Sequence, residues 1–208
     1  MREELILDVP YRQVVFVIPK MLRIFFKYKR QLLGQLCRAA VQALLKYLQA
    51  ITGTELRPGI VASIQTFGEK IIFHAHLHLL VTEGGEYSEG RFHHLAEFQD
   101  SLLAEFFKRE VFSLLLRQGL ISEAVVEKIE GWCHSGFSVH SKVKAKTKQD
   151  AERVAKYMIR PLLSLERLFL DEREGKVCYW YGKEATEVER MDYLEFIARV
   201  TSHIPDKG

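Results

Sequence analysis

Residues 71–81 read IIFHAHLHLLV, and this stretch decides how we interpret the rest of the chain. It is an apolar run interrupted by three histidines at alternate positions. In a β-strand alternate side chains share a face, so His74, His76 and His78 would project together from one side. Neutral imidazole is the commonest metal ligand in proteins, and two imidazoles at i and i+2 can hold one divalent ion. The stretch therefore predicts a strand that carries a metal site. The alternative is a solvated strand face, which would crowd groups that repel one another when protonated.

A metal held by His76 and His78 needs further ligands, and two candidates compete for the third position. Gln65 belongs to the β-rich run that precedes a hairpin turn near Gly68. A four-residue turn would pair Gln65 with His74 and bring its amide diagonally towards His76, whereas a two-residue turn would leave it too far away. His74 itself is the other candidate. The sequence does not choose between them.

Hydrophobic periodicity on both sides of this stretch predicts an α+β fold. We expect strands over residues 12–19 and 136–146, a hairpin of two β-rich runs within residues 57–85 that are joined near Gly68, and a second hairpin over 168–181. We expect helices over residues 31–52, 92–120, 122–132, 147–160 and 191–203. The hairpins indicate a largely antiparallel β-sheet with helices packed on it. Because no repeat or linker interrupts the pattern, we expect a single domain over residues 1–208.

Tyr157 is the second candidate group, on the helix expected over residues 147–160. Helical spacing places Arg153 four residues before it and Arg160 three residues after it, so both guanidiniums should flank the phenol. Such cations favour phenolate and match the charge of a phosphate that a tyrosine could attack. The alternative is a tyrosine that only packs at the boundary of an amphipathic helix.

Basic residues gather in two places, although the formal net charge is only +3. One cluster lies within residues 20–38, and the other alternates along a strand-like segment: Lys142, Lys144, Lys146 and Lys148. Either these are solvated faces or they bind the phosphates of a nucleic acid. We expect Lys142 and Lys144, together with Arg153 and Arg160, to contact DNA phosphates.

The composition excludes several classes of protein. Of the 208 residues 48% are hydrophobic and 27% are charged, which is typical of a globular domain and not of a disordered chain. The apolar runs are too short to span a membrane, and no secretory signal is visible. Three cysteines without a CxxC pair suggest a reducing compartment and neither a disulfide framework nor a cysteine zinc site. We therefore expect a cytoplasmic protein.

The motifs taken together resemble those of the HUH tyrosine transposases of the insertion-sequence ninety-one group, including the ISCR relatives. Members of that family typically read HPHLH on a strand and then a Tyr-x-x-Arg-Pro segment that runs into SLERL-like text. This chain has HAHLH at 74–78 and AKYMIRPLLSLERL at 155–168. Further similar segments are FVIPKMLRIFF, IQTFG, WCHSGFSVH and DYLEFIARVTSHIP, all in the family's order between about residues 10 and 206.

The resemblance implies that His76 and His78 are the paired metal ligands, that Tyr157 is the nucleophile, and that the cofactor is Mg²⁺ or Mn²⁺. It implies the antiparallel fold of replication initiators and relaxases. The implied activity is metal-dependent cleavage of single-stranded DNA and strand transfer in rolling-circle-type transposition, through a covalent 5′-phosphotyrosine. The expected partner is single-stranded DNA at transposon ends and target, with a homodimer to be tested, no membrane, and association with the prokaryotic nucleoid when bound to DNA.

The sequence departs from the family at three points. Arg153 stands where many members have a second tyrosine, so the chain is similar to single-tyrosine members, and Ala75 replaces a proline. We also expect the chain to lack the amino-terminal zinc-binding module and the carboxy-terminal extension of longer relatives. One alternative is therefore a truncated, non-catalytic remnant that only binds single-stranded DNA. Another is a zinc hydrolase in which Tyr157 is structural, although no HExxH motif accompanies the histidines.

Overall fold

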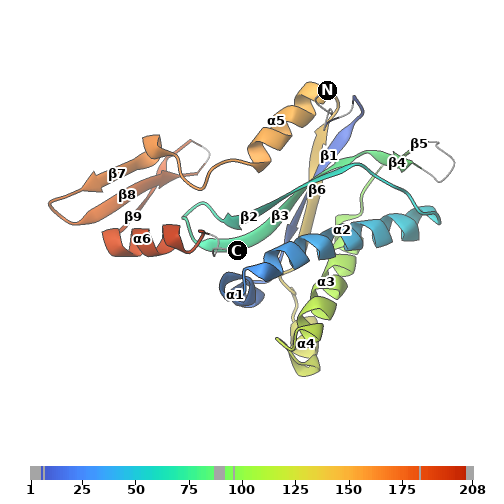
Figure 1. Cartoon of the computed structure of the whole chain (residues 1–208), viewed down its shortest axis with the longest axis horizontal. Coiled ribbons are helices and arrows are strands. Elements are labelled where there is room, and N and C mark those ends of the chain that lie inside the picture. Colours follow the sequence, from blue (N-terminus) through green and yellow to red (C-terminus); the bar gives the residue numbers. More distant parts are fainter. Residues whose placement is uncertain (1–5, 7, 87–91, 96, 183, 205–208) are drawn as a thin grey trace.

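The computed structural model describes residues 6, 8–86, 92–95, 97–182 and 184–204. Its strands form three antiparallel sheets (Figure 1). The main sheet has the order β2-β3-β1-β6, with β1 Tyr11–Val17, β2 Ile60–Phe67, β3 Phe73–Thr82 and β6 Ser138–Ala145. A short pair comprises β4 Gly84–Glu86 and β5 Phe92–His94, and the third sheet comprises β7 Leu168–Asp171, β8 Lys176–Tyr181 and β9 Glu187–Asp192. The predicted α+β class with antiparallel sheets is confirmed.

Six α-helices accompany these sheets in the described part of the chain. They are α1 Arg23–Tyr28, α2 Gln31–Thr52, α3 Asp100–Arg117, α4 Glu123–Glu130, α5 Lys148–Met158 and α6 Tyr193–Thr201. Short 3₁₀ turns precede α1 at Lys20–Leu22 and follow α5 at Leu165–Arg167. Among the described residues, no helix is both long enough and apolar enough to cross a membrane.

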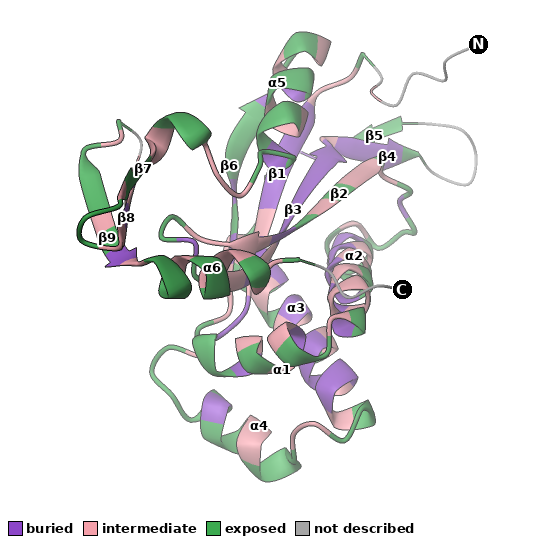
Figure 2. Cartoon of the chain, turned by 60° about the vertical axis from the view of Figure 1, so that its left-hand side comes forward, coloured by how far each residue is buried: buried purple, intermediate pink, exposed green. Residues whose placement is uncertain are grey.

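The two faces of the main sheet carry different elements. One face packs against α2 and α3, where alternate strand residues such as Phe16, Leu77 and Leu79 are fully buried (Figure 2). The rings of Phe16 and Phe107 meet edge-on at 4.9 Å across this interface. On the opposite face α5 lies over the sheet, and the histidines of β3 project there because they alternate with the core residues. The fold thus confines the main core to one face and leaves the other face for the polar cluster.

Helix α2 forms where the three- and four-residue spacing of its apolar residues predicts it. Leu36, Ala40, Leu44 and Leu48 fall on one side of the helix and are all fully buried. The helix ends at Gly53, whose φ of 71° lies in the left-handed region that glycine adopts without strain.

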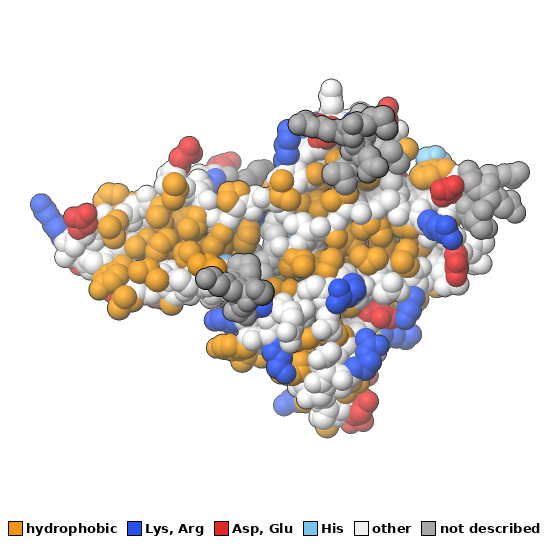
Figure 3. Space-filling view, viewed as in Figure 1, with side chains coloured by type: hydrophobic (Ala, Val, Ile, Leu, Met, Phe, Trp, Pro, Cys, Tyr) orange, Lys and Arg blue, Asp and Glu red, His pale blue; other side chains and the backbone are white. Residues whose placement is uncertain are grey.

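The third sheet and α6 form a smaller layer with its own apolar cluster, at the left of Figure 1. Hydrophobic side chains also gather on its outer surface (Figure 3), where Leu194 and Ile197 of α6 are more than half exposed. His203 joins this layer to the turn between β2 and β3. Its Nε2–H donates to the carbonyl of Ile71 at 3.1 Å, its Nδ1 lies 3.0 Å from the Thr66 hydroxyl, and its ring stacks on Phe73.

The structure corrects three of the predicted boundaries. The helix predicted over residues 92–120 is two elements, since residues 92–94 form β5 and α3 begins at Asp100. Strand β9 is absent from the sequence prediction, because EVERMD at 187–192 is charged on both faces and reads as a loop. The last helix accordingly begins at Tyr193 and not at residue 191, with the Asp192 carboxylate accepting from the Leu194 amide.

Candidate functional site

The three histidines of β3 lie side by side in the middle of the main sheet. The ring centroids of His74 and His76 are 5.0 Å apart, and those of His76 and His78 are 4.9 Å apart. Strand β3 has β2 on one side and β1 on the other, so neighbouring strands supply further side chains to the same face. The single face expected from alternation is therefore the one that the structure has.

Hydrogen bonds leave several ligand atoms of this cluster without a partner. His76 Nδ1 donates to the carbonyl of His74 at 2.8 Å, which leaves the lone pair on its Nε2. His74 Nε2, His78 Nε2 and Gln65 Oε1 are buried without a hydrogen-bond partner. Buried polar atoms are normally satisfied, and unpaired ones that converge are what a bound ion would complete. The donor set of imidazole nitrogens and an amide oxygen fits a divalent metal.

Gln65 reaches this cluster by a register different from the predicted one. It pairs directly with His76 across β2 and β3, and not with His74. Two single-residue differences explain this: Phe67 pairs with Phe73 around a turn of residues 68–72, which is one residue longer than predicted, and a register shift between Gln65 and Phe67 adds one more. Its Nε2 donates to the carbonyl of Met158 at 2.9 Å, so its other amide atom, Oε1, is the unpaired one. Both predicted third ligands, Gln65 and His74, thus remain candidates by geometry.

No group of three or more His, Cys, Asp or Glu side chains in the described ranges already has the spacing of a metal site. Among the residues that the structure describes, no carboxylate is hydrogen-bonded to the three histidines. The ligand atoms that the described residues offer to a metal here are imidazole nitrogens and an amide oxygen.

Burial keeps the three histidines neutral near pH 7. It lowers the pKa of His74 and of His78 to about 4, with smaller contributions from nearby positive charge, chiefly Arg23 for His74 and protonated His76 for His78. The pKa of His76 is lowered by burial as well, although its bond to the His74 carbonyl acts in the opposite direction. Neutral imidazole is the form that binds metals.

Helix α5 brings Tyr157 to this face. The predicted capping box opens the helix, with Thr147 and Asp150 bonding to each other's backbone amides. At its other end, the Met158 carbonyl accepts from both Ser63 Oγ and Gln65 Nε2 at 2.9 Å. The Tyr157 ring stands perpendicular to His78 with centroids 6.3 Å apart, and the residue is 51% exposed. The phenol is thus close to the histidines and open to a ligand.

The two arginines predicted to flank Tyr157 are placed differently. The Arg160 guanidinium lies 4.9 Å from the centre of the Tyr157 ring and 5.8 Å from that of Phe67. Arg153 bonds to Asp150 in the first turn of α5 and is largely exposed. Arg160 therefore lies against the phenol ring, whereas Arg153 is held by the capping residue Asp150 and lines a depression that Tyr157 also lines.

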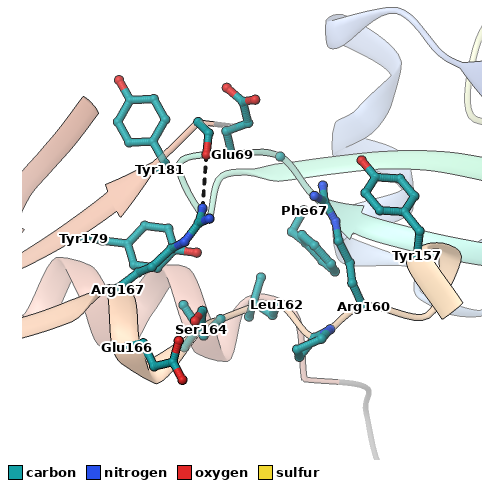
Figure 4. A pocket seen from close by; sticks show the side chains of 14 residues that line it. Phe67, Glu69, Tyr157, Arg160, Leu162, Ser164, Glu166, Arg167, Tyr179 and Tyr181 are labelled. Atoms are coloured by element: carbon teal, nitrogen blue, oxygen red, sulfur yellow. Dashed lines mark hydrogen bonds between the residues drawn. The ribbon is translucent and has the colours of Figure 1, made fainter. Parts of the chain in front are cut away.

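Two depressions meet at Tyr157. The first, here called the lysine groove, has a volume of about 470 Å³ and is lined by Gln13, Val143, Lys144, Lys146, Asp150, Arg153, Val154 and Tyr157. The second, here called the strap cleft, has a volume of about 550 Å³ and lies on the Arg160 side, between β2 and the third sheet (Figure 4). Tyr157 therefore lies where a ligand could run from one depression into the other.

The strand-like segment predicted to carry Lys142, Lys144, Lys146 and Lys148 ends before the last two of these lysines. Strand β6 ends at Ala145, and Lys148 is already the first residue of α5. Lys144 lines the lysine groove and lies 3.8 Å from Glu83, while Lys142 is exposed on β6 outside the lining of both depressions.

Three residues at the site were missed by the sequence analysis. The Gln13 amide lies 3.0 Å from His78 Nδ1, and the Phe67 ring lies 5.8 Å from the Arg160 guanidinium. The positive charge of Arg23 helps to lower the pKa of His74. Gln13 could have been found, because it is a polar residue inside the apolar strand YRQVVFV on the same face as the histidines.

An antiparallel sheet with paired histidines on a central strand, and a tyrosine helix packed on the same face, defines an HUH-endonuclease-like protein. Comparison with known proteins agrees: the chain belongs to the transposase family Y2_Tnp, whose family model, described as "Putative transposase", matches residues 59–208. The expected kinship with HUH rolling-circle transposases is thereby confirmed.

One curated relative is the transposase for insertion sequence element IS801 of Pseudomonas savastanoi pv. phaseolicola, 26% identical over 218 aligned residues. The alignment covers 96% of this chain and 52% of the relative, so the chain spans about half the length of the curated relative that it matches. No solved structure matches the chain significantly.

Proposed function

We propose that this transposase-family chain is a metal-dependent single-stranded DNA endonuclease and strand transferase that acts through a covalent 5′-phosphotyrosine at Tyr157. The observation that carries the proposal is the position of the phenol. Tyr157 is half exposed, 6.3 Å from the His78 ring and 4.9 Å from the Arg160 guanidinium, at the junction of two depressions. A phosphate placed there would meet a nucleophile, a cation and the unpaired imidazole nitrogens together.

The chemistry is a transesterification at phosphorus. Tyr157 Oη forms a bond to phosphorus, the bond from phosphorus to the 3′-oxygen breaks, and the phenolic proton ends on the released 3′-hydroxyl by way of solvent. Because one phosphoester bond forms for each one that breaks, a 3′-hydroxyl from another strand can reverse the step and release Tyr157. This reversal is strand transfer.

The residues of the chain have separate roles in this proposal. His76 and His78, with Gln65 or His74 as a third ligand, would hold Mg²⁺ or Mn²⁺, which supplies Lewis-acid stabilisation of charge on a non-bridging oxygen. Arg160 would neutralise the phosphate that reacts. Lys144 and Arg153 would hold phosphates along the lysine groove, with Lys142 at its periphery, and binding should weaken with salt.

The matched test uses two tyrosines of similar exposure. With Mn²⁺ and a single-stranded oligonucleotide from an end of the element, the chain should form a protein–DNA adduct that survives denaturation. Tyr157→Phe should abolish the adduct, whereas Tyr193→Phe, on α6 with 46% exposure, should leave it unchanged. An undiminished adduct in Tyr157→Phe would place the nucleophile elsewhere.

The two alternatives predict different results in the same assay. A non-catalytic remnant would retain the strand in a mobility-shift gel without an adduct in any metal. A zinc hydrolase would cut DNA with Tyr157→Phe as well as with the unchanged chain. The homodimer stays a prediction, to be measured by sedimentation of the chain with and without the strand.

A further inference from the structure

The strap cleft extends beyond the residues that the proposed chemistry uses. Residues 160–167 form its floor, the turn after β2 its upper edge, and the end of β8 its far wall (Figure 4). Its volume of about 550 Å³ falls in the range of about 300–1,000 Å³ of small-molecule sites. A single phosphate would fill only part of such a cavity, so the cleft has room for a larger group next to Tyr157.

Aromatic and aliphatic side chains make up the walls of the strap cleft. Tyr179 and Tyr181 alternate along β8 and so share one face, and Phe67 contributes a ring from β2. Both tyrosines are only 7% exposed, and the Tyr181 hydroxyl donates to Glu187 at 2.8 Å, which fixes that ring. Leu162 and Leu163 cover the floor. Lys70 Nζ lies 5.0 Å from the centre of the Tyr181 ring, so a nucleobase would contact the small exposed part of these fixed tyrosines together with the half-buried Phe67 ring.

The charged groups of the cleft differ between its two ends. Arg160 lies at the Tyr157 end, against the rings of Tyr157 and Phe67. At the other end Figure 4 shows Glu166 and Arg167, with Arg167 Nη1 donating to the carbonyl of Gly182 at 3.1 Å. A carboxylate repels a phosphate but accepts hydrogen bonds from the amino group of a base. The cleft has arginines at both ends and a further carboxylate, Glu69, at its upper edge, so what distinguishes the Glu166 end, here called the base-reading end, is a carboxylate beside Arg167 that can accept from a base.

We propose that the strap cleft binds one nucleotide of the single strand, the nucleotide next to the phosphate at Tyr157, with its base among Phe67, Tyr179 and Tyr181 and its polar edge at Glu166. The inference rests on the proposed function for the position of the strand, and it adds a base-selective subsite. Bases that carry an amino group facing Glu166, such as cytosine, are bound more tightly than thymine.

The first experiment locates the base by photo-crosslinking. The Tyr157→Phe chain is mixed with a 12-nucleotide thymidine strand in which 5-iodouridine replaces one thymidine at a time. After irradiation, the crosslinked peptides are identified by mass spectrometry. We expect crosslinks on the peptides that carry Phe67, Tyr179 or Tyr181. Crosslinks confined to α1 and β6 would overturn the proposal.

The second experiment tests the base-reading end with an exposed side chain, so that folding is not at risk. Fluorescence anisotropy measures the Kd of 12-nucleotide cytidine and thymidine strands for the Tyr157→Phe chain. Glu166→Ala should reduce the preference for cytidine about fivefold or more. Glu172→Ala, an exposed acidic residue on the β7–β8 turn, should leave the preference unchanged. An identical preference with and without Glu166 would refute the base-reading end.

The subsite and the proposed function can fail separately. A covalent adduct that forms while crosslinks avoid the strap cleft would refute the subsite and leave the nuclease. Crosslinks in the cleft without an adduct from the unaltered chain would support the subsite and refute the nuclease.

Discussion

Gln13 and His78 are diagonal neighbours on β1 and β3, and the Gln13 side-chain amide lies 3.0 Å from His78 Nδ1. The amide nitrogen faces the imidazole, and a half-turn of the amide would present its oxygen instead. With the oxygen there, Nδ1–H donates to it and the lone pair falls on the buried, unpartnered Nε2. Gln13 can thus select the tautomer of His78 that binds a metal.

Replacing Gln13 should therefore weaken metal binding without removing a ligand. We expect Gln13→Leu to reduce Mn²⁺ affinity about 10- to 100-fold, measured by isothermal titration calorimetry. Gln118→Leu, an exposed glutamine at the end of α3, is the control and should bind Mn²⁺ normally. Equal affinity of Gln13→Leu and the unchanged chain would mean that Gln13 does not orient His78.

The metal-free chain should lose stability as the pH falls from about 6.5 towards 4. The pKa of His74 and His78 is about 4 in the folded chain and near 6.5 when unfolded, so the unfolded chain binds more protons in this window. The contribution of these two histidines to the unfolding free energy is fully present above pH 6.5 and declines as the pH falls below it. Urea unfolding in EDTA at several pH values measures the slope. His78→Gln should flatten it between pH 6.5 and 5, where few carboxylates titrate, and His140→Gln, exposed on β6, should not.

The two arginines near Tyr157 should have unequal effects on adduct formation. Arg160 lies on the phenol ring, so Arg160→Ala should slow the step on the order of 100-fold. Arg153 is bound to Asp150 and exposed, so Arg153→Ala should mainly weaken strand binding, with a shallower salt dependence. Single-turnover rates at saturating DNA separate the two effects. Equal rate losses would contradict the placement of Arg160.

Ser63 should affect the nucleophile through the end of α5. Its hydroxyl donates to the Met158 carbonyl, one residue after Tyr157, and it is not a candidate ligand. We expect Ser63→Ala to cost about 0.5–1.5 kcal/mol of unfolding free energy and to slow adduct formation while Mn²⁺ affinity stays unchanged. Ser202→Ala is the control, because it also removes a hydroxyl that donates to a helix carbonyl, that of Arg199, which is far from Tyr157 in the sequence. A Ser63→Ala chain with normal adduct kinetics would show that this bond does not position Tyr157.

Local chemistry made much of this fold predictable. The shared face of the histidines follows from strand alternation, and the start of α5 follows from the Thr147–Asp150 capping box. The register of β2 does not follow from such rules, because a longer turn and a register shift between Gln65 and Phe67 together move Gln65 opposite His76. Ile71, in the turn, adopts a φ of 60°, which is uncommon for a β-branched residue and gives no sequence signal.

The remaining differences come from contacts between distant segments. Residues 92–94 fall within the range predicted as a helix, but they pair with β4 as a short strand. Strand β9 is stabilised by its pairing with β8 and by Arg199, which reaches Glu189 from α6. Arg160 lies beyond the end of α5, so helical spacing could not place its guanidinium over both Phe67 and Tyr157.

The contacts of His203 have a mechanical consequence. This one side chain fastens the far end of α6 to Thr66 and Ile71, next to the strand that holds the imidazoles. Arg199, which donates to the Lys70 carbonyl, and the Lys70–Glu189 ion pair join the same two parts of the chain. On the proposed function, a pull on DNA bound in the strap cleft would therefore reach β3 through several contacts, of which His203 is the aromatic one.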